Sequence, residues 1–390
     1  MQSTKKTAFE FIDKHRTEML SLWEDFVNTE SPSADKGSVD RMAGKIAAVL
    51  REDGCAPDTI PFENAGNMLV ATAFKDGPGI PVALMGHFDT VFPLGTIEQR
   101  PFSIRDGNAY GPGVLDMKGG IVILLYALKA LRAAGYAARP IKVVLAGDEE
   151  IGHPKSDANA IFQRELKGCL AAFNCETGST SDRLVVGRKG SAVFTLEVRG
   201  VAAHAGVDPE NGRSAIHEIA HKVLEIQQLN GRGDGTSFNV GTIRGGKTFN
   251  AVPDYATIDV DIRFVKASAV EESIGELNRI AATNHVAGTQ TTVAGRINFP
   301  PMETTPEIMR LFELVARTSV ENGFPLPSAV QSGGGSDSSN SVMAGVPTVC
   351  SMGVKGERNH APEEFAIVDS LFERCKLLVA CLLNLDTHGF

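Results

Sequence analysis

The feature that most constrains the fold is a set of short apolar runs that alternate with amphipathic segments. Runs of strand length occur at 80–85, 141–146 and 170–175, and a helical pattern covers 120–134. Strands that alternate with helices are typical of a mostly parallel sheet with helices on both faces, so this part of the chain predicts an α/β domain. The remaining elements predicted for that domain are helices over 7–28, 40–53, 306–321 and 369–385 and a strand over 346–352.

The pattern changes near residue 183, where the strands begin to alternate apolar and polar residues. Their order with two helices is β-α-β-β-α-β, which is typical of a split-βαβ (ferredoxin-like) sandwich. The predicted elements are 191–199, 214–229, 238–243, 256–264, 269–283 and 289–297. We therefore expect a discontinuous main α/β domain, 1–182 and 299–390, with the small domain 183–298 inserted into it.

The composition excludes several classes of protein. The chain carries 38 Lys and Arg against 47 Asp and Glu, a formal net charge of −9, so it lacks the positive charge on which general nucleic-acid or anionic-membrane binding depends. No apolar stretch approaches the ~18 residues of a membrane span. Charged residues also interrupt any signal-peptide core near the N-terminus. The six cysteines lack metal-binding spacing and favour reduced core thiols in the cytoplasm.

Acidic residues and histidines follow the predicted strands at the points where those strands end. The carboxyl ends of parallel strands meet at one edge of a sheet, which is where open α/β sheets bind ligands. The residues so placed are His87 and Asp89, the run Asp148-Glu149-Glu150, Glu176 and His360, together with Asp116 in a glycine-rich turn before a helix. We expect these side chains to converge.

Several carboxylates cannot all stay ionised at close range without a compensating cation. Imidazole and carboxylate donors without thiolate suit zinc, or cobalt and manganese as substitutes. The number of donors exceeds what one catalytic zinc with an open position needs. It matches two metal ions about 3.5–4 Å apart that share a bridging carboxylate.

Six motifs occur in an order that resembles the M20 family of di-zinc metallopeptidases. They are GHFDTVFP (86–93), GPGVLDMKGG (111–120), GDEEIG (147–152), CETG (175–178), AHAG (203–206) and NH (359–360). The resemblance covers nearly the whole chain and is closest to the glutamate carboxypeptidase (carboxypeptidase G2-like) branch.

The resemblance implies roles for individual residues. Asp116 matches the carboxylate that bridges the two zinc ions, Glu150 and His360 the other ligands of one ion, and His87 and Glu176 those of the other. Asp89 matches the acid that holds the His87 imidazole, and Glu149 matches the general base. His204, in the inserted domain, matches the histidine that stabilises the oxyanion, often across a dimer.

The inserted domain and a glycine-rich loop match substrate-contact positions of the same branch. Arg263 and Asn250 resemble such positions, and the planar fork of an arginine suits a terminal carboxylate. Arg296 is a weaker match to a second carboxylate-binding arginine. The loop residues Gly334, Gly335 and Ser336 resemble the family's loop beside the substrate.

The implied activity is hydrolysis of the amide bond to a C-terminal amino acid by a zinc-activated water with Glu149 as base. The substrate would be a small peptide or N-acyl amino acid, and the protein a cytoplasmic homodimer formed through the inserted domain. The alternative within the family is an N-acyl amino acid deacylase of the acetylornithine or succinyl-diaminopimelate type. A metal-loaded binding protein without turnover is a further alternative, which the presence of Glu149 disfavours.

Two further motifs compete with this interpretation. Residues 241–248 (GTIRGGKT) match the phosphate-loop pattern, but a strand rather than the required helix is predicted to follow, so we interpret the motif as a turn. Residues 217–221 (HEIAH) match HExxH, the signature of single-zinc proteases. No third ligand is evident in the sequence, and this site would leave the strand-end cluster unexplained. We interpret it as a solvated or partner-facing helix edge.

Overall fold

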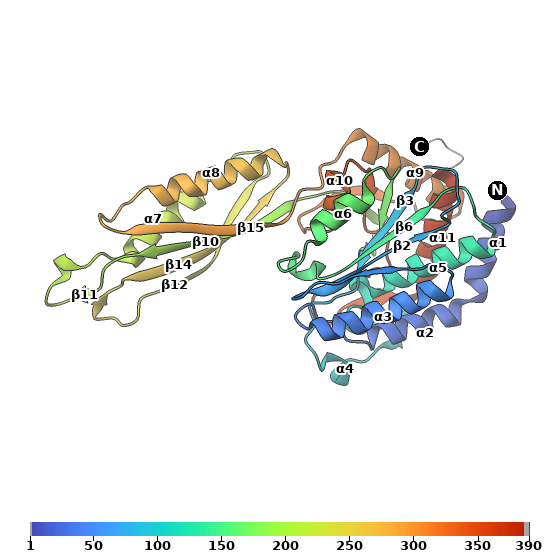
Figure 1. Ribbon diagram of the computed structural model, residues 1–390, viewed down its shortest axis with the longest axis horizontal. Helices are drawn as coiled ribbons and strands as arrows, with labels where there is room; N and C mark the ends of the chain where they lie inside the picture. Colours follow the sequence, from blue (N-terminus) through green and yellow to red (C-terminus); the bar gives the residue numbers. More distant parts are fainter. Residues whose placement is uncertain (1, 386–389) are drawn as a thin grey trace. The chain divides into compact units, whose positions relative to one another are not determined.

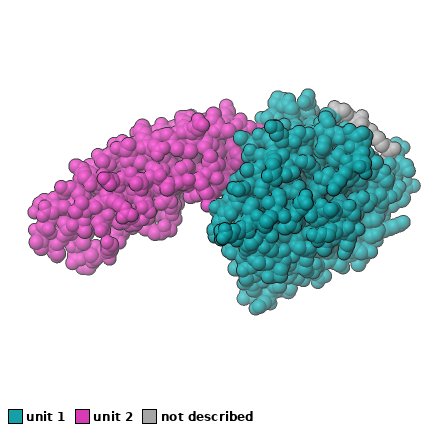
Figure 2. Space-filling view, viewed as in Figure 1, with its two compact units in different colours: residues 1–187, 304–331, 336–390 teal, residues 188–303, 332–335 magenta. Residues whose placement is uncertain are grey.

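The computed structural model describes residues 2–385 and 390, and the chain divides into two compact units (Figure 2). Unit 1 comprises residues 1–187, 304–331 and 336–390, and unit 2 comprises residues 188–303 and 332–335. The roles expected for the two domains, catalysis for one and lid or dimerisation for the other, stay predictions at this point.

The central sheet of unit 1 has six strands in the order β1-β2-β6-β3-β7-β17 (Figure 1). Their bounds are β1 Asp58–Ile60, β2 Gly66–Ala73, β6 Ile141–Gly147, β3 Val82–His87, β7 Ala172–Asn174 and β17 Thr348–Val349. Strands β6, β3, β7 and β17 run parallel, whereas β2 is antiparallel to β6, and β1 to β2. The predicted mostly parallel sheet is confirmed, with an antiparallel edge that the sequence analysis missed.

Helices cover both faces of this sheet. The helices of the described part of unit 1 are α1 Gln2–Lys14, α2 Arg16–Val27, α3 Lys36–Glu52, α4 Thr96–Gln99, α5 Gly119–Ala133, α6 Ala158–Leu166, α9 Pro306–Glu321, α10 Ser338–Met343 and α11 Val368–Leu385. A smaller sheet has the order β4 Ser103–Arg105, β5 Asn108–Tyr110, β19 Phe365–Ile367, β18 Lys355–Glu357 and β8 Gly178–Ser179. Strands β9 Arg183–Arg188 and β16 Ser328–Ser332 form a separate pair.

Alternate residues of the central strands enter two different cores. In β3, Leu84 packs into the larger core with α5 and α11, whereas Met85 packs into a smaller core with α6. Strand β6 repeats the pattern with Val143 and Val144. Successive strand residues point to opposite faces, so a strand between two helix layers must be apolar throughout. This is why the apolar runs identified the parallel strands.

Unit 2 is a four-stranded antiparallel sheet, in the order β12-β14-β10-β15, packed against two helices (Figure 1). Its elements are β10 Gly190–Arg199, β11 Ala203–His204, α7 Ala215–Gln228, β12 Ser237–Gly245, β13 Ala251–Val252, β14 Tyr255–Phe264, α8 Ser268–Ala282 and β15 Gln290–Phe299. Leu196 and Ile258 pack against Ile219 of α7 and Leu277 of α8. Because apolar and polar residues alternate in these strands, the apolar side chains lie on the face that packs against the helices. The predicted ferredoxin-like fold of this domain is confirmed.

Some local predictions were wrong. The single helix expected over 7–28 is two helices, because His15 departs from helical geometry with φ −105° and ψ 23°. Strand β2 and helix α6 were not predicted.

The interpretation of the phosphate-loop match as a turn is confirmed. Strand β12, a turn and strand β13 occupy the region where a phosphate-binding loop requires a helix. Among residues 2–385 and 390, no helix combines the length and the apolar character needed to cross a membrane.

Candidate metal centre

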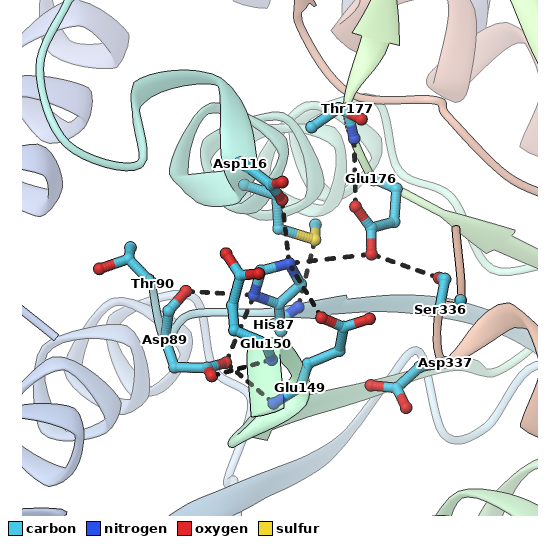
Figure 3. A network of polar contacts seen from close by, with 12 residues as sticks. His87, Asp89, Thr90, Asp116, Glu149, Glu150, Glu176, Thr177, Ser336 and Asp337 are labelled. Atoms are coloured by element: carbon cyan, nitrogen blue, oxygen red, sulfur yellow. Dashed lines mark hydrogen bonds and ion pairs between the residues drawn. The ribbon is translucent and has the colours of Figure 1, made fainter. Parts of the chain in front are cut away.

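His87 is the last residue of β3, and its buried imidazole lies at the centre of the cluster at the carboxyl edge of the sheet (Figure 3). Its Nδ1 lies 3.3 Å from Oδ1 of Asp89, and its Nε2 lies 3.1 Å from Oδ1 of Asp116. Asp89 is also fully buried and accepts a hydrogen bond of 2.6 Å from the hydroxyl of Ser33. The ring is therefore held at one nitrogen while the other faces the cluster.

Glu149 and Glu150 lie on a short helical turn that follows β6. Asp89 fixes this turn, because its two carboxylate oxygens accept the backbone N–H groups of Glu149 and Glu150, each at 3.1 Å. The two glutamates reach different imidazoles. Oε2 of Glu149 lies 3.9 Å from Nε2 of His87, and Oε2 of Glu150 lies 3.0 Å from Nε2 of His360. One acid thus positions a histidine and both glutamates.

Asp116 has a carboxylate whose two oxygens face opposite sides of the cluster. Oδ1 lies near His87, and Oδ2 lies 3.2 Å from Nε2 of His360 and accepts a 3.1 Å hydrogen bond from Nδ2 of Asn359. The turn that carries Asp116 is held by Glu364, whose Oε1 accepts the backbone N–H of Asp116 at 3.1 Å. The carboxylate therefore presents one oxygen to each of the two histidines.

Glu176 follows β7 and completes the cluster. Its Oε1 lies 3.8 Å from Nε2 of His87 and accepts a hydrogen bond of 3.3 Å from the hydroxyl of Ser336. The end of β7 approaches the start of α5 so closely that a Cβ atom on Gly120 would overlap the carbonyl oxygen of Cys175. A glycine at this position therefore lets the segments that carry Asp116 and Glu176 come together.

The cluster concentrates acidic groups that are hard to ionise together. Burial and the charge of Asp116 raise the pKa of Glu150 to about 7. Burial also raises the pKa of Glu149 well above its usual range, and the charge of Glu176 adds to this while His87 opposes it. Burial would likewise raise the pKa of Asp116, but hydrogen bonds with His360 and His87 hold it well below its usual range. The arrangement calls for additional positive charge.

The donor set fits divalent metal ions. The ligand atoms of His87, Glu149 and Glu176 lie within 4.8 Å of one another, as do those of His87, Asp116 and Glu150. Oε1 of Glu150 is buried and has no hydrogen-bond partner within the part of the chain that the structure describes. An unpartnered buried carboxylate oxygen is costly unless a cation contacts it. Imidazole and carboxylate without thiolate suit zinc, cobalt or manganese.

His204 and Asn250 belong to unit 2, where the structure brings them close together. Strand β11 pairs with β13, so that His204 lies opposite Ala251, and the backbone N–H of Ala205 donates to the carbonyl of Asn250 at 3.0 Å. Both side chains are exposed. Nδ1 of His204 accepts the backbone N–H of Gly206 at 3.1 Å, so a neutral His204 carries its proton on Nε2.

Arg263 and Arg296 lie on the two strands that flank β10 in the unit 2 sheet. Arg263 of β14 pairs with Ser191 of β10, and Arg296 of β15 pairs with Val193, two residues further along β10. Both arginines therefore lie on the same face, opposite α7 and α8. Nε of Arg263 donates to Asp261 at 2.9 Å. Nε of Arg296 donates to Asn298 at 2.8 Å.

The residues of the glycine-rich loop belong to both units: Gly334 and Gly335 are part of unit 2, and Ser336 is part of unit 1. The carbonyls of Gly334 and Gly335 accept hydrogen bonds of 3.2 Å from Nη1 of Arg188 in unit 2. Ser336 is fully buried in unit 1 and contacts Glu176. A substrate-contact role for these three loop residues stays a prediction, and the side chain of Ser336 already supports a candidate metal ligand.

A model of Peptidase family M20/M25/M40 matches residues 83–384. The chain belongs to this peptidase family. It is accordingly a hydrolase that acts on amide bonds. Over 391 residues it is 24% identical to carboxypeptidase G2 of Pseudomonas sp. (strain RS-16), an alignment that covers 98% of this chain and 93% of that protein.

Two further comparisons bear on the branch and the fold. Over 278 residues the chain is 31% identical to a succinyl-diaminopimelate desuccinylase of Cupriavidus pinatubonensis, which covers 65% of this chain and 71% of that protein. The crystal structure of aminopeptidase PepT from Bacillus cereus ATCC 10987 superposes with a TM-score of 0.78 at 22% identity, covering 94% of this chain and 97% of that one. The structural likeness shows that the M20 fold is shared.

The sequence analysis did not predict a buried network of three side chains that lies beside the cluster around His87 and Asp116. His153 lies between two carboxylates, with Nδ1 2.7 Å from Oδ1 of Asp148 and Nε2 2.7 Å from Oδ1 of Asp337. Burial alone would lower the pKa of His153, but the charges and hydrogen bonds of Asp337 and Asp148 raise it well above its usual range. The three residues link the turn after β6 to the start of α10. His153 lacks a recognisable spacing to Asp337, so no local pattern identifies the pair.

Proposed function

We propose that this protein removes a C-terminal amino acid, glutamate in the first instance, from a small peptide or N-acyl amino acid. One observation carries the proposal: the two oxygens of Asp116 face His87 on one side and His360 on the other, and Glu149 lies beside His87. We assign Glu150 and His360 to one zinc ion and His87 and Glu176 to the other, with Asp116 shared. Cobalt or manganese would suit the same donors.

The chain's own residues supply binding, orientation and proton transfer. Zinc in such a site provides Lewis-acid activation of water and of the amide carbonyl. Glu149 accepts the proton of the attacking water and delivers it to the leaving nitrogen. Asp89 holds both the His87 ring and the turn that carries Glu149, so that base and ligand keep a fixed separation.

His204 is proposed as the donor to the developing oxyanion. Its Nδ1 already accepts a hydrogen bond from Gly206, which leaves Nε2–H as the donor. Arg263 lies near one end of β14, and His204 lies beyond the other end, which begins at Tyr255. Eight residues of extended strand span about 26 Å. A single small substrate cannot contact both groups in one subunit, which supports a homodimer through unit 2 in which the partner provides the histidine.

Arg263 is proposed to bind the free carboxylate of the departing amino acid. Its Nε donates to Oδ2 of Asp261 at 2.9 Å, which limits rotation of the planar guanidinium. Arg296, on the same face as Arg263, is proposed as a secondary contact, and so is Asn250 of the subunit that provides His204. A planar guanidinium distinguishes a carboxylate from a neutral group by paired hydrogen bonds.

We also propose a cytoplasmic location. All six cysteines are buried and free of disulfides, which is the usual condition of thiols in a reducing compartment.

The second candidate function is deacylation of an N-acyl amino acid such as acetylornithine or succinyl-diaminopimelate. The identity to a succinyl-diaminopimelate desuccinylase favours it over an unrelated reaction. The bond cleaved and the metal ligands are the same, so only the groups that contact the acyl and amino acid portions distinguish the two.

A hydrolysis panel tests the choice. We expect N-acyl glutamates and glutamate-terminated dipeptides to be cleaved faster than acetylornithine or succinyl-diaminopimelate. We also expect elemental analysis of the purified protein to find two zinc-type ions per chain. Arg263→Ala should lower kcat/KM for carboxylate-bearing substrates by about 10–150-fold, the loss of one charge-assisted hydrogen-bonded contact.

The control is Arg244→Ala, which removes another exposed arginine of the same sheet whose partner is Asp259. It should leave kcat/KM unchanged. Faster cleavage of succinyl-diaminopimelate than of any glutamate conjugate would favour the deacylase. An undiminished kcat/KM in Arg263→Ala would remove the carboxylate clamp.

A further inference from the structure

The HExxH segment of α7 forms a cluster of imidazoles on the surface of unit 2. His217 and His221 are one helical turn apart, so their side chains lie on the same face of α7. Their Nε2 atoms are 3.2 Å apart. This pair takes no part in the hydrolytic function proposed above.

The glutamate of the motif rules out a protease site on this helix. Glu218 is fully buried, with Oε1 2.8 Å from Nζ of Lys222 and Oε2 accepting the backbone N–H groups of His285 and Val286. A general base must reach a water beside the metal. Glu218 instead points into the core between α7 and the segment after α8, so the helix presents the two histidines alone.

The separation of the two imidazoles matches a chelated metal ion. Zinc binds imidazole nitrogen at about 2.0–2.1 Å in a tetrahedral shell, which places two ligating nitrogens about 3.3 Å apart. The observed Nε2–Nε2 distance of 3.2 Å already meets this requirement. Two ligands on one rigid helix need little rearrangement to bind, so the cost of ordering them is small.

A third imidazole holds His221 in this orientation. The ring of His285 stacks on that of His221 with centroids 4.4 Å apart and an interplanar angle of 16°. Nε2 of His285 contacts Oε1 of Glu225, which lies one turn after His221 on α7. The stack limits rotation of the His221 ring, and the nearby carboxylate adds negative charge that favours a cation.

We propose that His217 and His221 form a second metal-binding site on unit 2, separate from the cluster around Asp116. The ligand is a borderline divalent cation such as Ni²⁺, Cu²⁺ or Zn²⁺, for which imidazole is a preferred donor. The two Nε2 atoms supply two positions and water completes the shell. No hydrolytic chemistry is assigned to this site.

Equilibrium dialysis of the full-length protein against Ni²⁺, followed by elemental analysis, tests the proposal. The wild-type chain should take up one more Ni²⁺ per chain than His217→Ala or His221→Phe. The phenylalanine preserves the ring that stacks on His285 while removing the donor nitrogen. Comparison within one Ni²⁺ concentration cancels uptake by the cluster around Asp116, which both variants retain.

The control is His15→Ala, which removes a partly exposed histidine of unit 1 and should leave Ni²⁺ uptake unchanged. His217→Ala should also keep the wild-type rate of hydrolysis, since the residue is exposed and lies outside the hydrolytic machinery. Equal Ni²⁺ uptake by the wild type and both α7 variants would overturn the proposal. A loss in only one of the two variants would do so as well, because a chelate requires both rings.

Discussion

Two regions of the molecule combine histidine and glutamate in motifs that metalloenzymes use, and they differ in how the glutamates are partnered. In unit 1, Glu150 has a buried oxygen without a hydrogen-bond partner among the described residues, and Glu149 lies 3.9 Å from His87. In unit 2, Glu218 is matched by Lys222 and two backbone N–H groups. Only the first region has negative charge in excess of what its own residues neutralise.

A motif of histidine and glutamate therefore indicates catalytic chemistry only where its charged groups lack sufficient ion-pair and hydrogen-bond partners within the protein. Glu218 is a buried carboxylate with an ion pair to Lys222 and two backbone hydrogen bonds, and it contributes to the core of unit 2. A buried cluster of acids whose charge exceeds that of the imidazoles of His87 and His360 needs an external cation.

The largest effect is expected from Glu149→Gln. The amide cannot accept a proton, so kcat should fall by roughly 10²–10⁴-fold, the usual contribution of a general base. The metal content should stay at the wild-type value, because the ligand pairs around Asp116 are unchanged. Steady-state kinetics together with elemental analysis measure both quantities. Wild-type turnover in this variant would remove Glu149 from the role of base.

Glu218→Gln, the corresponding change in the α7 motif, should lower the stability of the protein and leave kcat unchanged. Removing the carboxylate leaves the buried ammonium of Lys222 without its charge partner, which should lower the free energy of unfolding by about 3 kcal/mol. At temperatures where the variant is folded, kcat should equal that of the wild type. Denaturant unfolding and steady-state kinetics measure the two quantities.

The matched control is Glu272→Gln, which changes an exposed glutamate of α8 that pairs with Arg232. Its effect on the free energy of unfolding should stay within about 0.5 kcal/mol. If folded Glu218→Gln lost its turnover, the α7 motif rather than the sheet-edge cluster would carry the chemistry.

The smallest effect concerns the pH dependence of stability. His153 has a raised pKa in the folded protein, so its stabilising contribution is complete below its unfolded pKa of about 6.5 and is lost as the pH rises toward the folded value. Over that range the contribution falls by about 1.4 kcal/mol per pH unit. Between pH 7 and 9, His153→Gln should therefore lose stability less steeply than the wild type.

Unfolding free energies of both proteins at several pH values measure this difference. Parallel curves for His153→Gln and the wild type would show that the histidine between Asp148 and Asp337 is not charged in the folded protein.

The α/β layout of unit 1 and the order of elements in the inserted β-α-β-β-α-β unit could be predicted from the residue pattern alone. Burial on two faces makes a strand such as β3 apolar throughout, and burial on one face makes a strand such as β10 alternate, so both patterns are local. The convergence of His87, Glu150 and Glu176 was also predictable, because parallel strands end at one edge of a sheet.

The side chains that support or neutralise these groups could not be predicted from the sequence, because the folded chain brings them in from distant positions. Ser33 reaches Asp89, Glu364 holds the turn of Asp116, and Asp337 meets His153 across long stretches of chain. Glu218 turns inward because Lys222 and the segment after α8 meet it there. Such pairings depend on how whole helices pack, and packing places residues side by side without leaving a spacing in the sequence.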